Sequence, residues 1–448
     1  MKKTTLVFLL LAAAIGGYVY YSEFRHATEK PAEDAPKPLY TFSGDDVTSI
    51  RVTRAGEGAP TTALERGDDG WKLTSPVPAR ADRMVAESLA GTLARIASAR
   101  SLPADPARMK EFGLAPPEAT VEIHLKSGQT QKLELGGRDF SDMNVYAREA
   151  GAKDVLLVPN SVLTEVARPV NELRDRSLVD LGAWSLVELD FHTPKTKFRL
   201  EKKGVSWDLA EPRSAPADGQ EEENLSNTLA GARFTDVVEE NFQDSPAAAA
   251  RYGFSLPQLT IHVRNEQGAE ATLLVGKNDG GKYFARDASR PLVFRIEDAV
   301  PKKFLDATFT SLHDKRVLRA AAGDFSQFTV RNEKQTMSAT LSAAGKWLVD
   351  EPAARKGKEV TVARIFDPLT NSRALEVLEP PSASVAAKLA KPLVELKLKE
   401  KTGGVTTVEV SAADGDFVYV RSSRSPAVFK FESYFLGQLN FTAEEISP

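Results

Sequence analysis

The 448-residue sequence has no cysteine, no basic block and no histidine cluster. Without thiols, it cannot form disulfides, zinc–thiolate sites, iron–sulfur clusters or a lipid-modified cysteine. With 58 Lys+Arg against 62 Asp+Glu, the formal net charge is −4, so the phosphate-neutralising surface of a nucleic-acid-binding protein is not indicated. No pair at zinc-ligand spacing occurs among the five histidines, which are His26, His124, His192, His262 and His313. We therefore expect no metal, no cofactor, no catalytic residue and no nucleic-acid partner.

One long hydrophobic run lies at the amino terminus. Lys2 and Lys3 precede the uncharged stretch from Leu6 to Tyr21, which is slightly shorter than the roughly 20 residues that a membrane helix needs. The tyrosines at its end are typical of a membrane interface, whereas the alanines at 12–14 would suit a cleaved signal peptide. We interpret residues 1–22 as a membrane anchor, with a signal peptide as the alternative.

The flanking charges predict the orientation of this anchor. Lysines before the run favour a cytoplasmic amino terminus, although Arg25 and Lys30 follow it. We therefore expect a single-pass protein of the bacterial inner membrane, with the bulk of the chain extracytoplasmic in the periplasm. Residues 23–43, rich in proline, alanine and charge, are expected to form a linker that buries no core.

The remaining chain repeats itself. A tryptophan followed five residues later by proline recurs at intervals of 136 and then 140 residues, at Trp71/Pro76, Trp207/Pro212 and Trp347/Pro352. Eighteen positions after each tryptophan stands an aliphatic residue, and four further on a leucine: Leu89 and Leu93, Leu225 and Leu229, Ile365 and Leu369. We interpret residues 44–181, 182–321 and 322–448 as three copies of one unit, the third divergent.

Each unit reads as strands, a helix, further strands and a short helix. Spacings of four, four and three predict a helix with the apolar face Val85, Leu89, Leu93 and Ile96, which Asp82 would cap. Pro368 should shorten the matching helix of the third unit. We predict an α+β fold of three tandem repeat units, each a mostly antiparallel sheet with helices on one face, after an N-terminal transmembrane helix.

Two recurring elements suggest a site. An arginine recurs near the end of one strand in every copy, at Arg148, Arg286 and Arg421, and these are candidate contacts for a ligand or partner. Pairing with a neighbouring carboxylate is the commoner role for such a residue. The glycines of Gly276–Lys282 match a phosphate loop in spacing, but Tyr283 stands where its hydroxyl residue belongs, so we interpret this segment as a hairpin turn.

These motifs together resemble a bacterial family, domain of unknown function 4340. The resemblance depends on Trp71/Pro76, Phe112-Gly-Leu-x-x-Pro117, Leu135-Gly136, Val145-Tyr-x-Arg148 and Leu173-Arg-Asp-Arg176-x-Leu178. The second copy repeats nearly all of them, whereas the third lacks the Phe-Gly-Leu element. The resemblance implies a single-span, envelope-exposed protein, often encoded beside gliding-motility-type ABC transporter components. The family has no established catalytic or binding residues.

We expect a membrane-tethered, extracytoplasmic, non-catalytic accessory or scaffold protein. Its partners would be the membrane, through the N-terminal span, and proteins of the cell envelope such as an ABC-type transport or motility complex. One alternative is a binding module for envelope polysaccharide or peptide. Another is a hydrolase with an active site between repeats.

Overall fold

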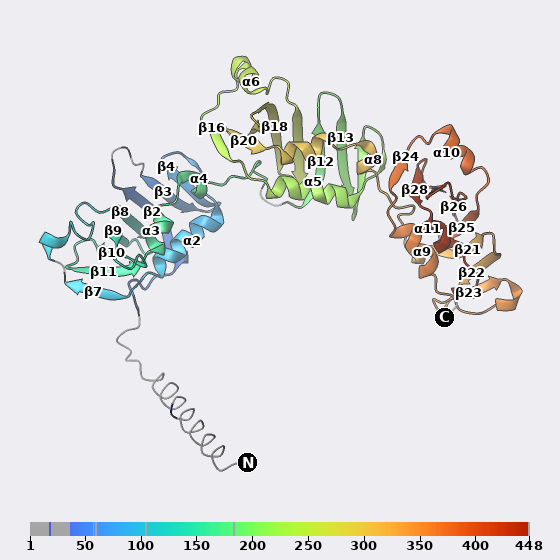
Figure 1. Ribbon diagram of the computed structural model, residues 1–448, viewed down its shortest axis with the longest axis horizontal. Helices are drawn as coiled ribbons and strands as arrows, with labels where there is room; N and C mark the ends of the chain where they lie inside the picture. Colours follow the sequence, from blue (N-terminus) through green and yellow to red (C-terminus); the bar gives the residue numbers. More distant parts are fainter. Residues whose placement is uncertain are drawn as a thin grey trace, which may run out of the picture. The chain divides into compact units, whose positions relative to one another are not determined.

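The computed structural model describes Tyr18 and residues 36–56, 58, 61–103, 105–181 and 184–446 (Figure 1). The chain divides into two compact units, Met1–Arg176 and Ser177–Pro448. The predicted anchor, Tyr18 apart, lies outside the described residues. Within them, no helix combines the length and apolar character needed to cross a membrane.

The first unit is built on a nine-stranded sheet in the order β5-β4-β3-β2-β8-β9-β10-β11-β7. A two-stranded sheet pairs β1 (Lys37–Pro38) with β6 (Ala97–Ser98). Helix α2 (Arg83–Ala94) contacts both α3 (Ser161–Val166) and α4 (Val170–Leu173). The strands are β2 (Val47–Arg54), β3 (Thr62–Gly67), β4 (Gly70–Ser75), β5 (Ala79–Arg80), β7 (Arg100–Pro103), β8 (Ala119–Leu125), β9 (Thr130–Arg138), β10 (Asn144–Glu149) and β11 (Asp154–Pro159).

The second unit contains two sheets with the same plan. The nine-stranded sheet has the order β15-β14-β13-β12-β17-β18-β19-β20-β16 and carries the helices α5 (Gly219–Gly231), α6 (Pro246–Tyr252), α7 (Ala299–Leu305) and α8 (Phe309–Leu312). Its strands are β12 (Leu186–His192), β13 (Lys197–Lys203), β14 (Ser206–Glu211), β15 (Ala215–Pro216), β16 (Asp236–Glu239), β17 (Leu259–Asn265), β18 (Glu270–Asp279), β19 (Lys282–Asp287) and β20 (Val293–Glu297).

The last sheet is eight-stranded, in the order β23-β22-β21-β25-β26-β27-β28-β24, with the helices α9 (Ala363–Thr370), α10 (Ala383–Lys388) and α11 (Tyr434–Leu439). Where the other large sheets have a two-residue edge strand, the backbone of Gly357 and Val360 donates to β23 instead. Every strand pairing of the described residues is antiparallel, so the α+β prediction with mostly antiparallel sheets is confirmed. The strands of the eight-stranded sheet are β21 (Phe325–Arg331), β22 (Thr336–Leu341), β23 (Trp347–Glu351), β24 (Glu376–Leu378), β25 (Val394–Glu400), β26 (Val405–Val410), β27 (Phe417–Ser422) and β28 (Val428–Glu432).

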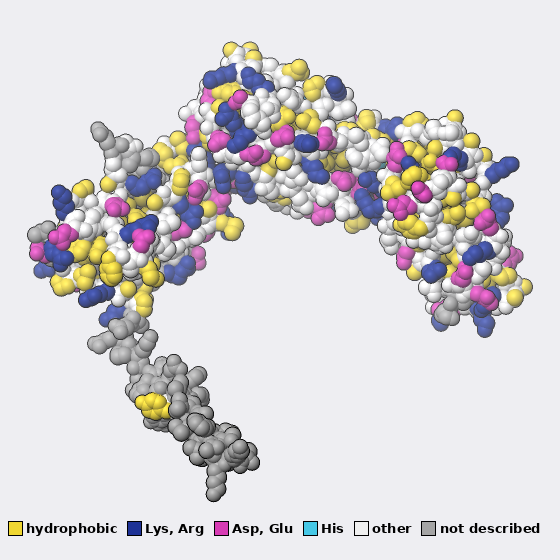
Figure 2. Space-filling model, in the orientation of Figure 1, with side chains coloured by type: hydrophobic (Ala, Val, Ile, Leu, Met, Phe, Trp, Pro, Cys, Tyr) yellow, Lys and Arg dark blue, Asp and Glu magenta, His cyan; other side chains and the backbone are white. Residues whose placement is uncertain are grey.

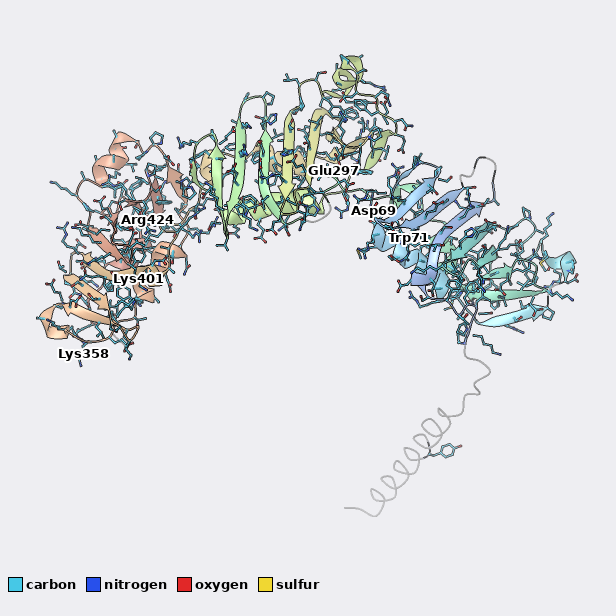
Figure 3. The ribbon with its side chains drawn as sticks, turned by 180° about the vertical axis from the view of Figure 1, so that it is seen from behind. Asp69, Trp71, Glu297, Lys358, Lys401 and Arg424 are labelled. Atoms are coloured by element: carbon cyan, nitrogen blue, oxygen red, sulfur yellow. The ribbon has the colours of Figure 1, made fainter. Side chains whose placement is uncertain are left out.

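The repeated tryptophans occupy matching places in separate cores. Trp71, Trp207 and Trp347 are 3%, 9% and 7% exposed and each packs in the apolar cluster of its own sheet. Trp71 lies on the first sheet, on β4 (Figure 3). Full burial of a large apolar side chain stabilises a fold by roughly 1.5–3 kcal/mol, which accounts for an aromatic at this position in each core. The proline that follows each tryptophan strand is preceded by a cis peptide bond.

The predicted helix follows the tryptophan strand in each copy. Asp82 caps α2 by accepting a hydrogen bond from the Val85 amide at 3.1 Å, as predicted. The helix ends at Ala94, so Ile96 lies beyond it, because the chain turns there into β6 to pair with β1. Helix α9 has eight residues against twelve in α2, and it contains Pro368, which confirms the predicted shortening.

The Phe-Gly-Leu element brings two backbones into contact. Gly113 has φ +68°, the left-handed conformation that glycine adopts without strain. A Cβ on Gly136 of β9 would lie 2.1 Å from the carbonyl oxygen of Phe112. In the second copy, a Cβ on Gly276 would lie 2.0 Å from the carbonyl oxygen of Tyr252. Each glycine therefore lets a loop seat directly on a strand.

A backbone latch closes each of the three large sheets. The Asp82 amide donates to the Leu173 carbonyl, the Asp218 amide to Leu312, and the Thr361 amide to Ile446, each at 2.8 Å. The start of the helix is thereby tied to the end of the same copy of the fold.

Candidate functional site

The three arginines predicted as ligand or partner contacts lie in three different sheets. Arg148 faces Glu134 across β10 and β9, with Nε and Nη2 at 2.9 and 2.5 Å from Oε2. Arg421 faces Glu409 across β27 and β26 in the same manner. In both sheets the guanidinium charge is neutralised by a carboxylate on the neighbouring strand. A ligand at either arginine has to compete with that carboxylate.

Arg286 has a different partner. Leu274 lies opposite it on β18, so no carboxylate is available across the strands. Its side chain is 8% exposed, contacts Asp244 at 2.8 Å and packs over the ring of Phe242 at 4.8 Å. Sequence spacing finds the arginine but not this partner, which comes from the loop before α6.

Side-chain ion pairs join the two sheets of the second unit. Several of them involve residues 312–319, which we call the joint segment. Burial alone would raise the pKa of Asp314, but hydrogen bonds from Arg316 and Arg319 hold the pKa below its usual value. Arg319 also reaches Asp208 at 2.8 Å and the carbonyl of Trp207 at 2.6 Å. The joint segment is therefore fixed to β14 of the preceding sheet.

The joint segment is equally fixed to the sheet that follows. Leu318 donates its amide to Leu369, and Ala374 donates to Lys315, both at 2.9 Å. Arg373 pairs with both oxygens of Asp218, which is 2% exposed and caps α5. Ion pairs to buried carboxylates and backbone hydrogen bonds therefore connect the two sheets, which belong to one compact unit.

His313 is the one histidine at this joint. It is 1% exposed and lies between the rings of Phe309 and Phe429, with centroids at 5.7 and 6.2 Å. Its Nδ1 donates to the Asp314 carbonyl at 2.7 Å, because a carbonyl oxygen only accepts. Its Nε2 lies 3.7 Å from Glu379 Oε2, and neither atom has a hydrogen-bond partner among the described residues.

A cavity of about 190 Å³ opens beside His313, lined also by Arg316, Arg319, Arg424 and Ser425 (Arg424 is labelled in Figure 3). Each guanidinium already contacts a carboxylate. Arg316 and Arg319 pair with Asp314, and Arg424 pairs with Glu400. The hydroxyl oxygen of Ser425 accepts from the Ala427 amide. The polar groups around the cavity are thus engaged with partners in the joint segment or in the last sheet, and no serine–histidine hydrogen bond occurs among the described atoms.

A larger groove of about 670 Å³ lies in the first unit. Three arginines line it, together with Glu118, Glu172 and Leu163: Arg54, Arg138 and Arg168. Arg54 donates to the Ala167 carbonyl at 3.2 Å, and Arg168 pairs with Glu165 and Glu172. This groove combines cationic and apolar groups on an open surface, which suits an extended ligand better than a small enclosed one.

The glycine-rich segment and two of the histidines lie in ordinary structural positions on hairpins and strands. Gly280 and Gly281 form the turn between β18 and β19, so the hairpin interpretation of the Gly276–Lys282 segment is confirmed. His124 and His262 lie on the wetter strand faces, each beside a threonine hydroxyl. The described part of the chain contains no group of three His, Cys, Asp or Glu side chains placed to hold a metal ion.

Comparison with known proteins gives one family. The family model described as Domain of unknown function (DUF4340) matches residues 71–245 and 207–392, so that each match begins at a repeated tryptophan. No curated protein matches the sequence.

The alignments with two solved structures span most of the chain. A DNA polymerase sliding clamp from Pseudomonas aeruginosa with ligand is 11% identical, with coverage of 91% of this chain and 97% of that chain and a TM-score of 0.15. A sliding clamp (DNA polymerase III subunit beta) from the same organism, bound to griselimycin, is 10% identical, with coverage of 86% and 90% and a TM-score of 0.15. Neither similarity carries an argument at that TM-score.

Proposed function

The chain belongs to the DUF4340 family, as its motifs predicted, and we propose that it is a non-catalytic, membrane-tethered, extracytoplasmic accessory or scaffold protein. The tether is the hydrophobic run at residues 1–22. The scaffold is a triplicated sheet-and-helix module, supported by the shared strand order of the three large sheets. The proposed partner is an ABC-type transport or motility complex, and this choice depends on the family resemblance.

The joint between the two sheets of the second unit carries the proposal. A scaffold has to hold its binding surfaces at a fixed spacing, and a flexible linker between sheets would not do so. Here Asp218 and Asp314 are 2% exposed and paired with arginines, and the pair of Asp218 with Arg373 joins the two sheets. These two buried carboxylates are thus used for internal architecture.

The test is recovery of a partner from membranes. Full-length tagged chain, cross-linked in cells and purified in mild detergent, should carry transporter subunits in a fixed ratio. The Arg373→Ala variant, which loosens the joint, should recover fewer of them than the matched surface variant Arg331→Ala, whose side chain is 62% exposed. If the wild-type chain carries no membrane protein above the level of an untagged strain, the proposal is wrong.

The groove of the first unit favours a second candidate, a module that binds envelope polysaccharide or peptide. Its lining places the Arg54 guanidinium, which donates to the Ala167 carbonyl, beside apolar groups and the carboxylates of Glu118 and Glu172, and a carboxylate of an acidic glycan or peptide would bind at Arg54. Co-sedimentation with isolated cell-wall sacculi tests this. Loss of binding in Arg54→Ala would place the ligand in the groove, whereas loss in Arg148→Ala and Arg286→Ala would place it at the strand arginines. Unchanged binding in all three variants would exclude both sites.

A further inference from the structure

The hairpin tip between β9 and β10 exposes two large apolar side chains. Phe140 is fully exposed and Met143 is 74% exposed. Figure 2 shows hydrophobic side chains on the surface of the first unit. Burying two such side chains in an apolar phase would be favourable, and their adjacency at one hairpin tip distinguishes them from apolar residues scattered singly over a surface.

The tip is held in one conformation. Asp139 accepts from the Ser141 hydroxyl at 2.8 Å and from the Asn144 amide at 3.2 Å. Asn160 donates its side-chain amide to the Asp142 carbonyl at 3.0 Å and its backbone amide to the Met143 carbonyl at 2.9 Å. A preorganised tip loses little conformational freedom when its side chains are buried by a partner.

The tip lies at the end of the sheet where the chain arrives from the linker. Strand β10 begins at Asn144, opposite Pro159 at the end of β11. Strands β7 and β6 follow one another beside β11, and β6 lies nearer to that same end. Strand β6 in turn pairs with Lys37–Pro38 of β1. Three strand spacings separate β10 from β1, which is about 15 Å.

The sequence before Lys37 limits how far this end can be from a bilayer. Residues 22–36 connect the hydrophobic run to β1. Fully extended, that segment spans at most about 50 Å. The end of the sheet that carries Phe140 is therefore also the end at which the chain enters from the linker, through β1.

The charges around this end fit an anionic lipid surface. Three exposed basic residues lie on or next to the elements at this end, namely Lys37 on β1, Arg95 directly after α2 and Arg100 on β7, while Arg138 pairs with Asp142 of the tip at 3.0 Å. Basic side chains attract anionic headgroups, while aromatic and Met side chains enter the boundary of the acyl chains.

Because the proposed function already tethers the chain to a membrane, we propose that this tip is a second lipid contact: Phe140 and Met143 insert into the interface of an anionic bilayer and seat the first unit against it. The inference rests on the proposed tether.

The absence of cysteine allows a direct test. Full-length chain carrying Phe140→Cys or Met143→Cys is labelled with an environment-sensitive fluorophore and reconstituted into phosphatidylethanolamine/phosphatidylglycerol vesicles. Ser127→Cys, in the exposed turn between β8 and β9 at the opposite end of the sheet, is the matched control. The labels at 140 and 143 should shift to the blue, resist aqueous iodide and be quenched by brominated lipid, whereas the label at 127 should do none of these.

Three results would overturn the inference, and they differ in what else they remove. If the chain floats with vesicles while the label at 140 is as open to iodide as the label at 127, only the lipid contact is lost. If shielding occurs in native membranes but not in pure lipid, the tip binds a protein pocket instead. If the chain does not float with vesicles at all, the proposed tether fails as well.

Discussion

Removing the guanidinium of Arg373 should loosen the joint between the two sheets of the second unit. Asp218 is 2% exposed, whereas the side chain of Arg373 is 35% exposed. Breaking a fully buried pair costs about 3–5 kcal/mol and an exposed pair about 0–1 kcal/mol. Asp218 keeps its capping bond from Gln220 and the attraction of Arg316. We therefore expect Arg373→Ala to destabilise the joint by about 2–3 kcal/mol.

Amide hydrogen exchange measures this locally. A loss of about 2–3 kcal/mol raises the opening equilibrium by about 30- to 150-fold, since 1.36 kcal/mol is a factor of ten. Peptides from the start of α5 and from residues 371–378 should exchange faster by that factor, while peptides of the first unit should not change. Arg331→Ala, in a surface pair, is the control and should alter exchange by less than about fivefold.

A second substitution isolates the charge. Asp218→Asn keeps an oxygen that can cap α5 but removes the buried negative charge. In that background, Arg373→Ala should cost much less than it does in the wild type, because no unpaired carboxylate is left behind. The reasoning is refuted if Arg373→Ala resembles Arg331→Ala, or if its cost is the same with asparagine at position 218.

Two further predictions concern packing and pH. Gly136→Ala should lower the midpoint of urea unfolding of the first unit strongly, because its Cβ would lie 2.1 Å from the Phe112 carbonyl, whereas Gly67→Ala, with its nearest atom at 3.8 Å, should change it little; equal effects would refute the close contact. The pKa of Asp314 is lowered in the folded state, so its contribution is complete above its unfolded pKa of about 3.9 and is lost as pH falls through the folded value. Thermal melting between pH 7 and pH 2 should therefore show a steeper acid loss in the wild type than in Asp314→Asn, and parallel curves would contradict this.

Local patterns in the sequence were sufficient for the repeated elements. Tryptophan recurs because each sheet needs a large apolar group on its edge-proximal strand, and the spacing of Leu89 and Leu93 gave the helix that covers it. The glycine of the Phe-Gly-Leu element, Gly113, has positive φ, as a turn at a glycine favours. Such features depend on neighbours within a few residues or on strand alternation, which a single sequence displays directly.

The joint could not be predicted in this way. Arg373 and Asp218 are separated by 155 residues, and the helix-capping place that Asp218 shares with Asp82 does not reveal that its carboxylate pairs with Arg373. His313 looked like an isolated histidine because one of its ring neighbours, Phe429 of β28, lies far from it in the sequence, while the other, Phe309, is in α8. Arg286 kept its place in the repeat but changed its partner to Asp244, since Leu274 replaces the facing carboxylate. Long-range partners of this kind leave no periodic signal.

The backbone latches determine where the chain can be cut. A fragment ending near residue 321 retains the hydrogen bond from the Asp218 amide to the Leu312 carbonyl, so the start of α5 stays bound to the end of its copy. The same cut removes Arg373 and leaves the Asp218 carboxylate without its cation. Expression of that fragment should therefore improve with asparagine at position 218, a design rule that truncation by sequence boundaries alone would miss.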